Sequence, residues 1–193
     1  MAVAVAEVAP QVTVLEAGTL AAAVRLAGEA EGLRLILLDL KMPGAVGYSG
    51  IALLHAECPE VPILVVSSAD GSNAAEEARA FGAIGFLRKD SDLATIEAAL
   101  GKALGARSPD RPATSQNKAE EQVRHTVAQL TATQLKVLLA VLEGKLNKQI
   151  AHDLTMSEAT VKAHMTAIMR KLDVRNRTQA ALVARSLGLD LKH

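Results

Sequence analysis

The stretch NKQIAHDLTMSEATVKAHMTAIMRKL, residues 147–172, decides the architecture of the C-terminal half of the chain. Asn147 and Ser157 are residue types that cap helix N-termini, and each precedes a run with apolar residues three or four positions apart. Only a few residues separate the two runs, so the connection between them is tight. The stretch therefore predicts a short helix, a turn and a longer helix, the arrangement called a helix-turn-helix.

Two further helices are predicted around this pair. Thr131 and Gln134 have the spacing of a capping box, and Gly144 can take the left-handed conformation that ends the helix they begin. Asn176 with Gln179 predicts the start of the last helix of the chain. The first of these helices is expected to bury four leucines, Leu135, Leu138, Leu139 and Leu142.

The longer helix of the pair has two chemically different faces at 100° per residue. Its apolar side carries Val161, Met165, Ile168 and Leu172, which are expected to face a core. The opposite side is small and cationic, with Lys162, Ala163, Thr166 and Arg170. Such a face suits the DNA major groove, where lysine reaches guanine acceptors and threonine meets base edges. An ordinary solvated helix face is the alternative, and charge by itself does not separate the two. Four residues on the flanks, Lys148, Thr160, His164 and Lys171, are candidates for phosphate contacts.

Residues 130–184 resemble the LuxR-type DNA-binding domain of the NarL/FixJ regulators. The similarity is carried by Leu-Thr-Ala-Thr-Gln at 130–134, by Ser-Glu-Ala-Thr-Val-Lys-Ala-His-Met at 157–165, and by the run from Arg170 to Ala180. The resemblance implies a four-helix domain whose third helix reads the major groove, with Lys162, Ala163 and Thr166 toward the bases. It also implies that the fourth helix pairs two protomers, so double-stranded DNA and a second copy of the chain are the expected partners.

The charge of the chain is divided between its two halves. Lys plus Arg and Asp plus Glu both number 21 over the 193 residues. Residues 1–105 hold 7 basic and 13 acidic side chains, whereas residues 106–193 hold 14 basic and 8 acidic ones. Two prolines and little apolar content mark residues 106–125 as a linker. We therefore expect a domain at 1–105 and the DNA-binding domain at 126–193.

The N-terminal half alternates strand-like and helix-like segments, which predicts a parallel sheet covered by helices. The strand candidates are 12–15, 35–38, 63–66 and 84–87. The helix candidates are 19–30, 49–57, 73–81 and 91–104. Asp39, Ser67 and Lys89 each follow a strand, so they should meet at the carboxyl edge of the sheet.

Residues 12–104 resemble a response-regulator receiver domain, which has a flavodoxin-like fold. The resemblance implies that Asp39 is the phosphoacceptor, Ser67 the switch hydroxyl, Phe86 the switch aromatic and Lys89 the phosphoryl-binding lysine. A sensor histidine kinase is the partner implied by such a two-component system. A structural ion pair between Asp39 and Lys89 is the alternative.

The resemblance begins late in the chain. Eleven residues before Val12 are too few for the first strand, acidic pair and first helix of a receiver, because a parallel crossover alone needs about a dozen. We expect this strand and helix to be absent, which leaves the strands at Val12 and Leu35 with unpaired edges. Pairing of the Val12 strand with the Leu35 strand or with a second chain, or filling of the gap by residues 2–8, would cover those edges.

The missing acidic pair bears directly on the chemistry of Asp39. We assign no metal ligand and no cofactor, because the Mg²⁺ that a receiver uses lacks its acids here. The preferred hypothesis is a transcription regulator, not an enzyme, whose atypical receiver dimerises. Control by phosphorylation at Asp39 is the alternative, and a receiver that serves as a protein-binding scaffold is a third.

Several protein classes are disfavoured by what the sequence lacks. A single cysteine excludes an intramolecular disulfide and favours a reducing compartment, so a cytoplasmic protein is expected. No apolar run reaches the length needed to span a membrane. Phosphate-binding glycine loops and metal-binding histidine spacings are also missing. Three aromatic residues are too few for a single-strand binder, so duplex DNA is the expected nucleic acid.

Overall fold

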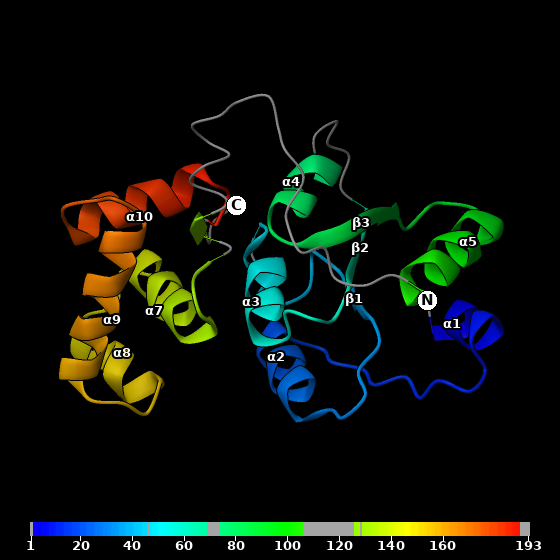
Figure 1. Cartoon of the computed structure of the whole chain (residues 1–193), viewed down its shortest axis with the longest axis horizontal. Coiled ribbons are helices and arrows are strands. Elements are labelled where there is room, and N and C mark those ends of the chain that lie inside the picture. The colour runs from blue at the N-terminus through cyan, green and yellow to red at the C-terminus, as the bar shows by residue number, and fades with distance from the viewer. Residues whose placement is uncertain (1, 46, 69–73, 106–125, 128, 190–193) are drawn as a thin grey trace.

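The computed structural model describes residues 2–45, 47–68, 74–105, 126–127 and 129–189 (Figure 1). An α/β part precedes residue 105 and an all-helical part follows residue 126. The predicted linker, 106–125, lies outside the described residues. In the described part of the chain, no helix is both long enough and apolar enough to cross a bilayer.

The described sheet has three parallel strands in the order β1-β2-β3. They are β1 (Ile36–Leu38), β2 (Ile63–Ser67) and β3 (Ala83–Arg88), so three of the four predicted strands are confirmed. β2 is central and buried along its whole length, as expected for a strand that is covered on both faces. The carboxyl ends of β1, β2 and β3 therefore lie at one edge of the sheet, where Ser67 ends β2 and where Asp39 and Lys89 directly follow β1 and β3.

Helices cover both faces of the sheet. On one face, α2 (Leu20–Glu29) and α3 (Ser49–Glu57) pack against each other, and α4 (Ala74–Ala80) packs on β3. On the other, α1 (Ala2–Val8) packs against α5 (Leu93–Leu104) over a small cluster that includes Leu64 and Leu100. Thr19 and Asp92 cap α2 and α5 with their side chains, so the predicted helices begin within about two residues of their expected starts.

The N-terminal segment differs from two expectations. Residues 2–8 form the helix α1, although no helix was expected before Val12. Residues 12–15 form no strand, and Val14 and Leu15 are 42% and 54% exposed. β1 bonds only to β2 in the described sheet, so its other edge is unpaired and residues 12–15 do not occupy it. Pairing of Val12–Leu15 with the Leu35 strand within one chain was therefore wrong.

The four helices predicted for the C-terminal part are present. They are α7 (Ala132–Leu142), α8 (Asn147–Asp153), α9 (Glu158–Lys171) and α10 (Arg177–Ser186). The Thr131–Gln134 capping box is present, and Ser157 and Asn176 cap α9 and α10 as predicted. α7 packs against α9 and α10, and α8 packs against α9.

The start of α8 corrects the sequence analysis. Leu146, not Asn147, is the N-cap, and its backbone N–H donates to Gln149 Oε1 at 2.8 Å. Asn147 is the first helical residue, and its Oδ1 accepts a hydrogen bond from Arg177 Nη1 at 3.0 Å. The sequence analysis assigned the cap to Asn147 from local spacing alone. In the structure the Asn147 side chain accepts a hydrogen bond from the distant Arg177 and does not cap the helix.

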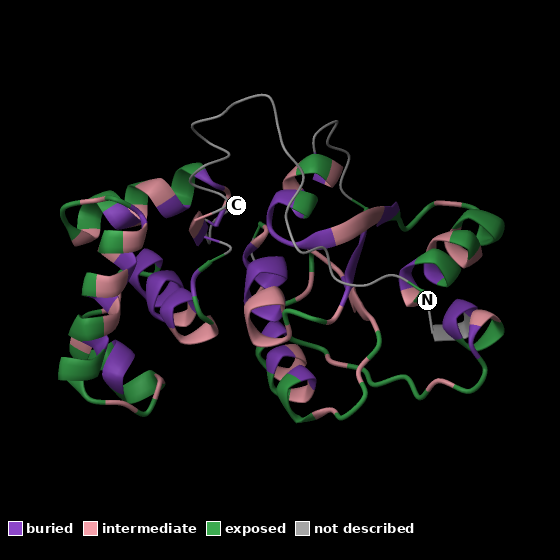
Figure 2. Ribbon diagram, viewed as in Figure 1, coloured by how far each residue is buried: buried purple, intermediate pink, exposed green. Residues whose placement is uncertain are grey.

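α7 is buried on nearly every side (Figure 2). The four predicted leucines are buried, but so are Val137, Ala140 and Val141 on the rest of the helix. A helix that is apolar all round lies between two packed layers. The second layer is α3 of the α/β part, and buried residues of both parts belong to one hydrophobic cluster.

Candidate functional site

The outer face of α9 has the composition and exposure required of a DNA-reading surface. Val161, Met165, Ile168 and Leu172 are buried beneath the helix, each at most 6% exposed. This packing leaves the opposite residues, Lys162, Ala163, Thr166 and Arg170, exposed to solvent. α9 lies on the side of the helical part that is turned away from the sheet (Figure 1). No other described part of the chain covers this face.

The flanking candidates divide into accessible residues and one that is already engaged. Lys148 and Thr160 are exposed, and His164 is half-buried. Thr160 Oγ1 lies 2.8 Å from Ser157 Oγ, within the capping interaction. Lys171 differs, because its Nζ donates to Gln129 O and to Gln134 Oε1, both at 2.9 Å. The Lys171 ammonium therefore ties the end of α9 to the start of α7.

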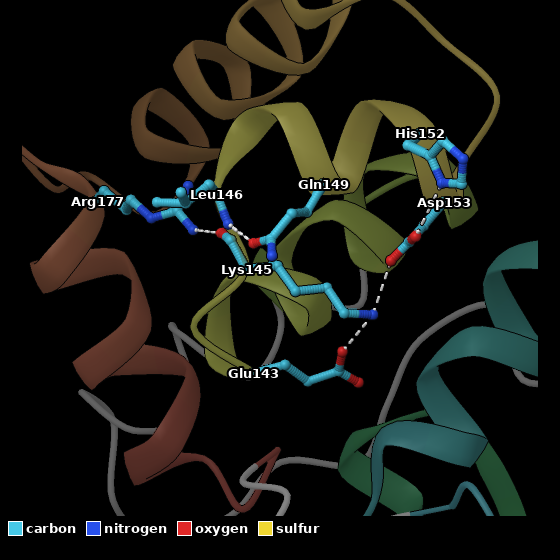
Figure 3. A network of polar contacts seen from close by, with 7 residues as sticks. All are labelled: Glu143, Lys145, Leu146, Gln149, His152, Asp153 and Arg177. Carbon is cyan, nitrogen blue, oxygen red and sulfur yellow. Dashed lines mark hydrogen bonds and ion pairs between the residues drawn. The ribbon is translucent and has the colours of Figure 1, made fainter.

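A polar network fixes the α7–α8 connection on which α8 and α9 depend (Figure 3). Lys145 Nζ bridges Glu143 at 2.7 Å and Asp153 at 2.9 Å. The hydrogen bonds that Lys145 donates to these two carboxylates raise its pKa. Arg177, from the first turn of α10, donates to the carbonyl of Lys145 and to Asn147. The network thus joins the start of α10 to the start of α8.

The carboxyl edge of the sheet brings the predicted acid and base together. Lys89 Nζ lies 2.5 Å from Asp39 Oδ2, and the Lys41 N–H donates to Asp39 Oδ1 at 3.0 Å. The Lys89 N–H donates to the carbonyl of Ser67 at 3.1 Å, and the residue Ser67 is fully buried. Phe86 is half-buried in β3, opposite Val65 in the register.

The pKa of Asp39 reflects these partners. Partial burial acts to raise the pKa, but the Lys89 hydrogen bond, the Lys41 N–H and the two lysine charges outweigh it. The pKa of Asp39 is therefore lowered below its usual value. Both carboxylate oxygens have a donor, so Asp39 is an ionised group held in a fixed orientation.

Comparisons with known proteins cover both parts of the chain. The family model "Bacterial regulatory proteins, luxR family" matches residues 128–184, and "Response regulator receiver domain" matches residues 3–101. The chain belongs to the NarL/FixJ-type response regulators. The receiver match begins at residue 3, earlier than the resemblance noted from sequence, and it includes most of α1.

Individual relatives span most of this response regulator. The "Glycerol metabolism activator" of Pseudomonas putida is 38% identical, over 91% of this chain and 84% of the relative. The "Nitrate/nitrite response regulator protein NarP" of Escherichia coli (strain K12) is 33% identical, over 88% and 80%. RcsB from Salmonella enterica serovar Typhimurium, solved bound to promoter rprA, is 19% identical over 93% and 89%, with a TM-score of 0.45. The first of these relatives is named as an activator and the second as a response regulator.

The receiver site of this response regulator does not fit a magnesium ion. Hard cations such as Mg²⁺ bind carboxylates and other oxygens in near-octahedral geometry. Asp39 supplies one carboxylate, and the ammonium of Lys89 occupies one of its oxygens. Among the described residues, no three His, Cys, Asp or Glu side chains come together in a metal-binding group. The described residues therefore lack the group of carboxylates that would hold Mg²⁺ beside the positive charge of Lys89.

Sequence reasoning missed Arg177 and the bridging role of Lys145. Arg177 lies 30 positions from Asn147 and 32 from Lys145 in the sequence, so no local spacing could join them. One signal was available: an arginine in the first turn of a helix is unfavourable beside the helix dipole, and such a residue needs another partner.

Proposed function

We propose that this response regulator binds duplex DNA as a dimer through α9, and that its receiver acts by dimerisation instead of phosphorylation. One observation carries the DNA assignment: Lys162, Ala163 and Thr166 form an exposed small and cationic face on a helix whose other face is locked into a core. Close approach to base edges requires small side chains on a rigid helix.

The outer face of α10 supports the dimer. Leu182 is 59% exposed there, although most leucines of the helical part are buried. An isolated exposed leucine is ordinary, but a leucine at the centre of the helix that pairs protomers in this family is suited to an isologous contact. Sedimentation of the full chain at micromolar concentration tests the proposal. A species that remains monomeric would overturn it.

The receiver site supports a mechanism without phosphorylation. Asp39 is bonded to Lys89 and to the backbone of Lys41, and it belongs to no group of three or more metal-binding side chains among the described residues. An incoming phosphoryl group would bring negative charge to a site where the described residues form no acidic group that could hold a compensating metal. The Asp39–Lys89 pair then serves to hold the carboxyl edge of the sheet together.

Lys162→Ala is the experiment that tests the DNA assignment. A duplex is first selected from a random library with the wild-type chain, and its affinity is then measured for the variant. If Lys162 contacts a base, we expect a loss of about 1–3 kcal/mol and relaxed preference at one base position. Lys102→Ala, an exposed lysine on α5, is the matched control and should leave the affinity unchanged. Unchanged affinity and preference in Lys162→Ala would contradict the assignment.

The second candidate function is control by phosphorylation at Asp39, with a sensor histidine kinase as the donor. The meeting of Asp39 and Lys89 at the sheet edge favours it. Incubation with acetyl phosphate and Mg²⁺, followed by intact mass measurement, separates the two candidates. We expect no stable mass gain. A gain of one phosphoryl group that is lost in Asp39→Asn would replace our proposal with this one.

A further inference from the structure

The two domains pack against each other through a defined interface. On the receiver side it consists of α3 and the turn at Gly47 and Tyr48, and on the other side of α7 and the end of α10 at Gly188. α3 packs directly against α7, and buried residues of both domains form one hydrophobic cluster. We call this the docking surface.

Polar contacts at the docking surface set its register. Glu57 Oε2 at the end of α3 lies 3.4 Å from Lys136 Nζ on α7, and both side chains are partly buried. The Tyr48 N–H donates to the carbonyl of Gly188 at 3.3 Å. The acidic receiver and the basic DNA-binding domain therefore meet through one matched charge pair beside a shared apolar core.

Two glycines allow the backbones to approach closely. A Cβ at Gly47 would lie 2.0 Å from the Gly188 carbonyl oxygen, and a Cβ at Gly188 would lie 3.4 Å from the Tyr48 ring. Tyr48 in turn stacks on Phe81, with ring centroids 5.6 Å apart. Only glycine at position 47 permits this fit, because the clashing atom belongs to the backbone and cannot rotate away.

The docking surface leaves both proposed interaction faces free. Lys162, Ala163 and Thr166 on α9 are exposed while the domains are docked, and so is Leu182 on α10. Figure 1 shows α7 between the receiver and α9, so the receiver reaches the helical domain from the side away from the DNA face. The docked arrangement of the two domains thus buries α7 and leaves the outer face of α9 exposed.

We infer that the docked receiver supports the DNA-binding domain without covering its DNA-binding face. The docked chain is therefore competent to bind duplex DNA. This inference rests on the proposed DNA-binding function and adds to it the relation between the receiver and the DNA-binding domain within one chain. A ligand changes a conformational equilibrium only if it distinguishes the two states. Because docking hides none of the α9 face, DNA has no steric reason to distinguish docked from undocked chains.

Locking the docked state tests the inference. Glu57→Cys and Lys136→Cys are introduced together with Cys58→Ser, which removes the native thiol, and a short bismaleimide joins the two new cysteines. The duplex is the one selected with the wild-type chain. We expect the locked and unlocked proteins to bind it with dissociation constants within about threefold of each other, below the roughly fivefold at which allosteric coupling typically begins. Weakening by about tenfold or more on locking would overturn the inference.

Gly47→Ala provides a second test from the opposite direction, since it should separate the domains. Gly44→Ala is the matched control: Gly44 also has a positive φ, of 84°, but its added Cβ would make only ordinary contact with Leu20 at 3.7 Å. We expect the 57–136 cross-link to form in Gly44→Ala and to fail in Gly47→Ala, with similar DNA affinity in both. A gain of about tenfold in Gly47→Ala alone would show that the receiver blocks DNA, which contradicts the inference. If the wild-type chain selects no duplex, the proposed DNA-binding function fails first.

Discussion

The surroundings of His55 shift its pKa away from the usual value of a histidine. His55 lies in the last turn of α3, and a Cβ at Gly82 would come within 2.7 Å of its ring. Nδ1 is buried without a hydrogen-bond partner among the described residues. Burial lowers the pKa of His55 below its usual value of 6.5, because the charged form loses its hydration.

The lowered pKa of His55 predicts a loss of stability in acid. The unfolded chain binds a proton on this histidine at a higher pH than the folded chain, so its contribution is fully present above about pH 6.5 and is lost as pH falls. Urea unfolding at about pH 7.5 and about pH 5.5 measures the difference. We expect His55→Phe to reduce it and His152→Gln, at an exposed histidine, to preserve it. An equal pH dependence in all three proteins would show that His55 does not titrate as described.

At the scale of elements, α10 is connected to the pair formed by α8 and α9. α8 and α9 form the helix-turn-helix, and α10 carries the proposed dimer contact. Arg177 joins these units, because it belongs to α10 and donates to the carbonyl of Lys145 and to Asn147. The orientation of α9 relative to a dimer axis thus depends on a side chain that need not touch DNA.

Arg177→Ala should therefore lower both stability and the preference for one spacing between half-sites. Loss of hydrogen bonds from a charged group costs about 1.5–3 kcal/mol, measured by urea unfolding of the full chain. Arg177→Lys keeps the positive charge but cannot donate to two acceptors through a planar guanidinium. Its loss of stability should therefore be smaller than that of Arg177→Ala. Inverted repeats with varied spacers report the second effect. Retention of both the spacing preference and the stability in Arg177→Ala would contradict the linking role.

At the scale of the whole molecule, segregated charge and the docking surface define how the protein meets DNA. The receiver is net acidic and the DNA-binding domain net basic, although the chain as a whole is neutral. When basic side chains neutralise DNA phosphates, condensed counterions are released. The affinity for DNA therefore falls as the salt concentration rises. We expect Lys171 to make no phosphate contact, since its ammonium is hydrogen-bonded to Gln129 and Gln134.

The salt dependence of binding should identify the phosphate contacts. The logarithm of the affinity should fall linearly with the logarithm of salt concentration, by about 0.9 per neutralised phosphate. We expect Lys148→Ala to reduce the slope by about one contact, with binding weakened uniformly across sequences. Lys171→Ala should destabilise the domain without this change in slope. An unaltered slope in Lys148→Ala would remove that residue from the interface.

The sequence by itself determined the elements and the chemistry of their faces. Caps such as Thr131 and Ser157, strand ends such as Asp39, and the apolar period of α9 were all predictable, because each depends on residues within about four positions of one another. The exposed residues that we propose to face DNA were also predictable, since burial of one side of a helix exposes the other.

Only the tertiary structure decided how these elements are used. It buried α7 against α3, bonded Lys171 to Gln134, drew Asn147 to Arg177, and left Val12–Leu15 without a strand partner. Each outcome depends on groups 30 or more positions apart, or on a strand that no local pattern supplies. Local spacing limits which hydrogen bonds a side chain can form with its neighbours in the sequence. Tertiary packing decides which distant group lies close enough to bond to it instead.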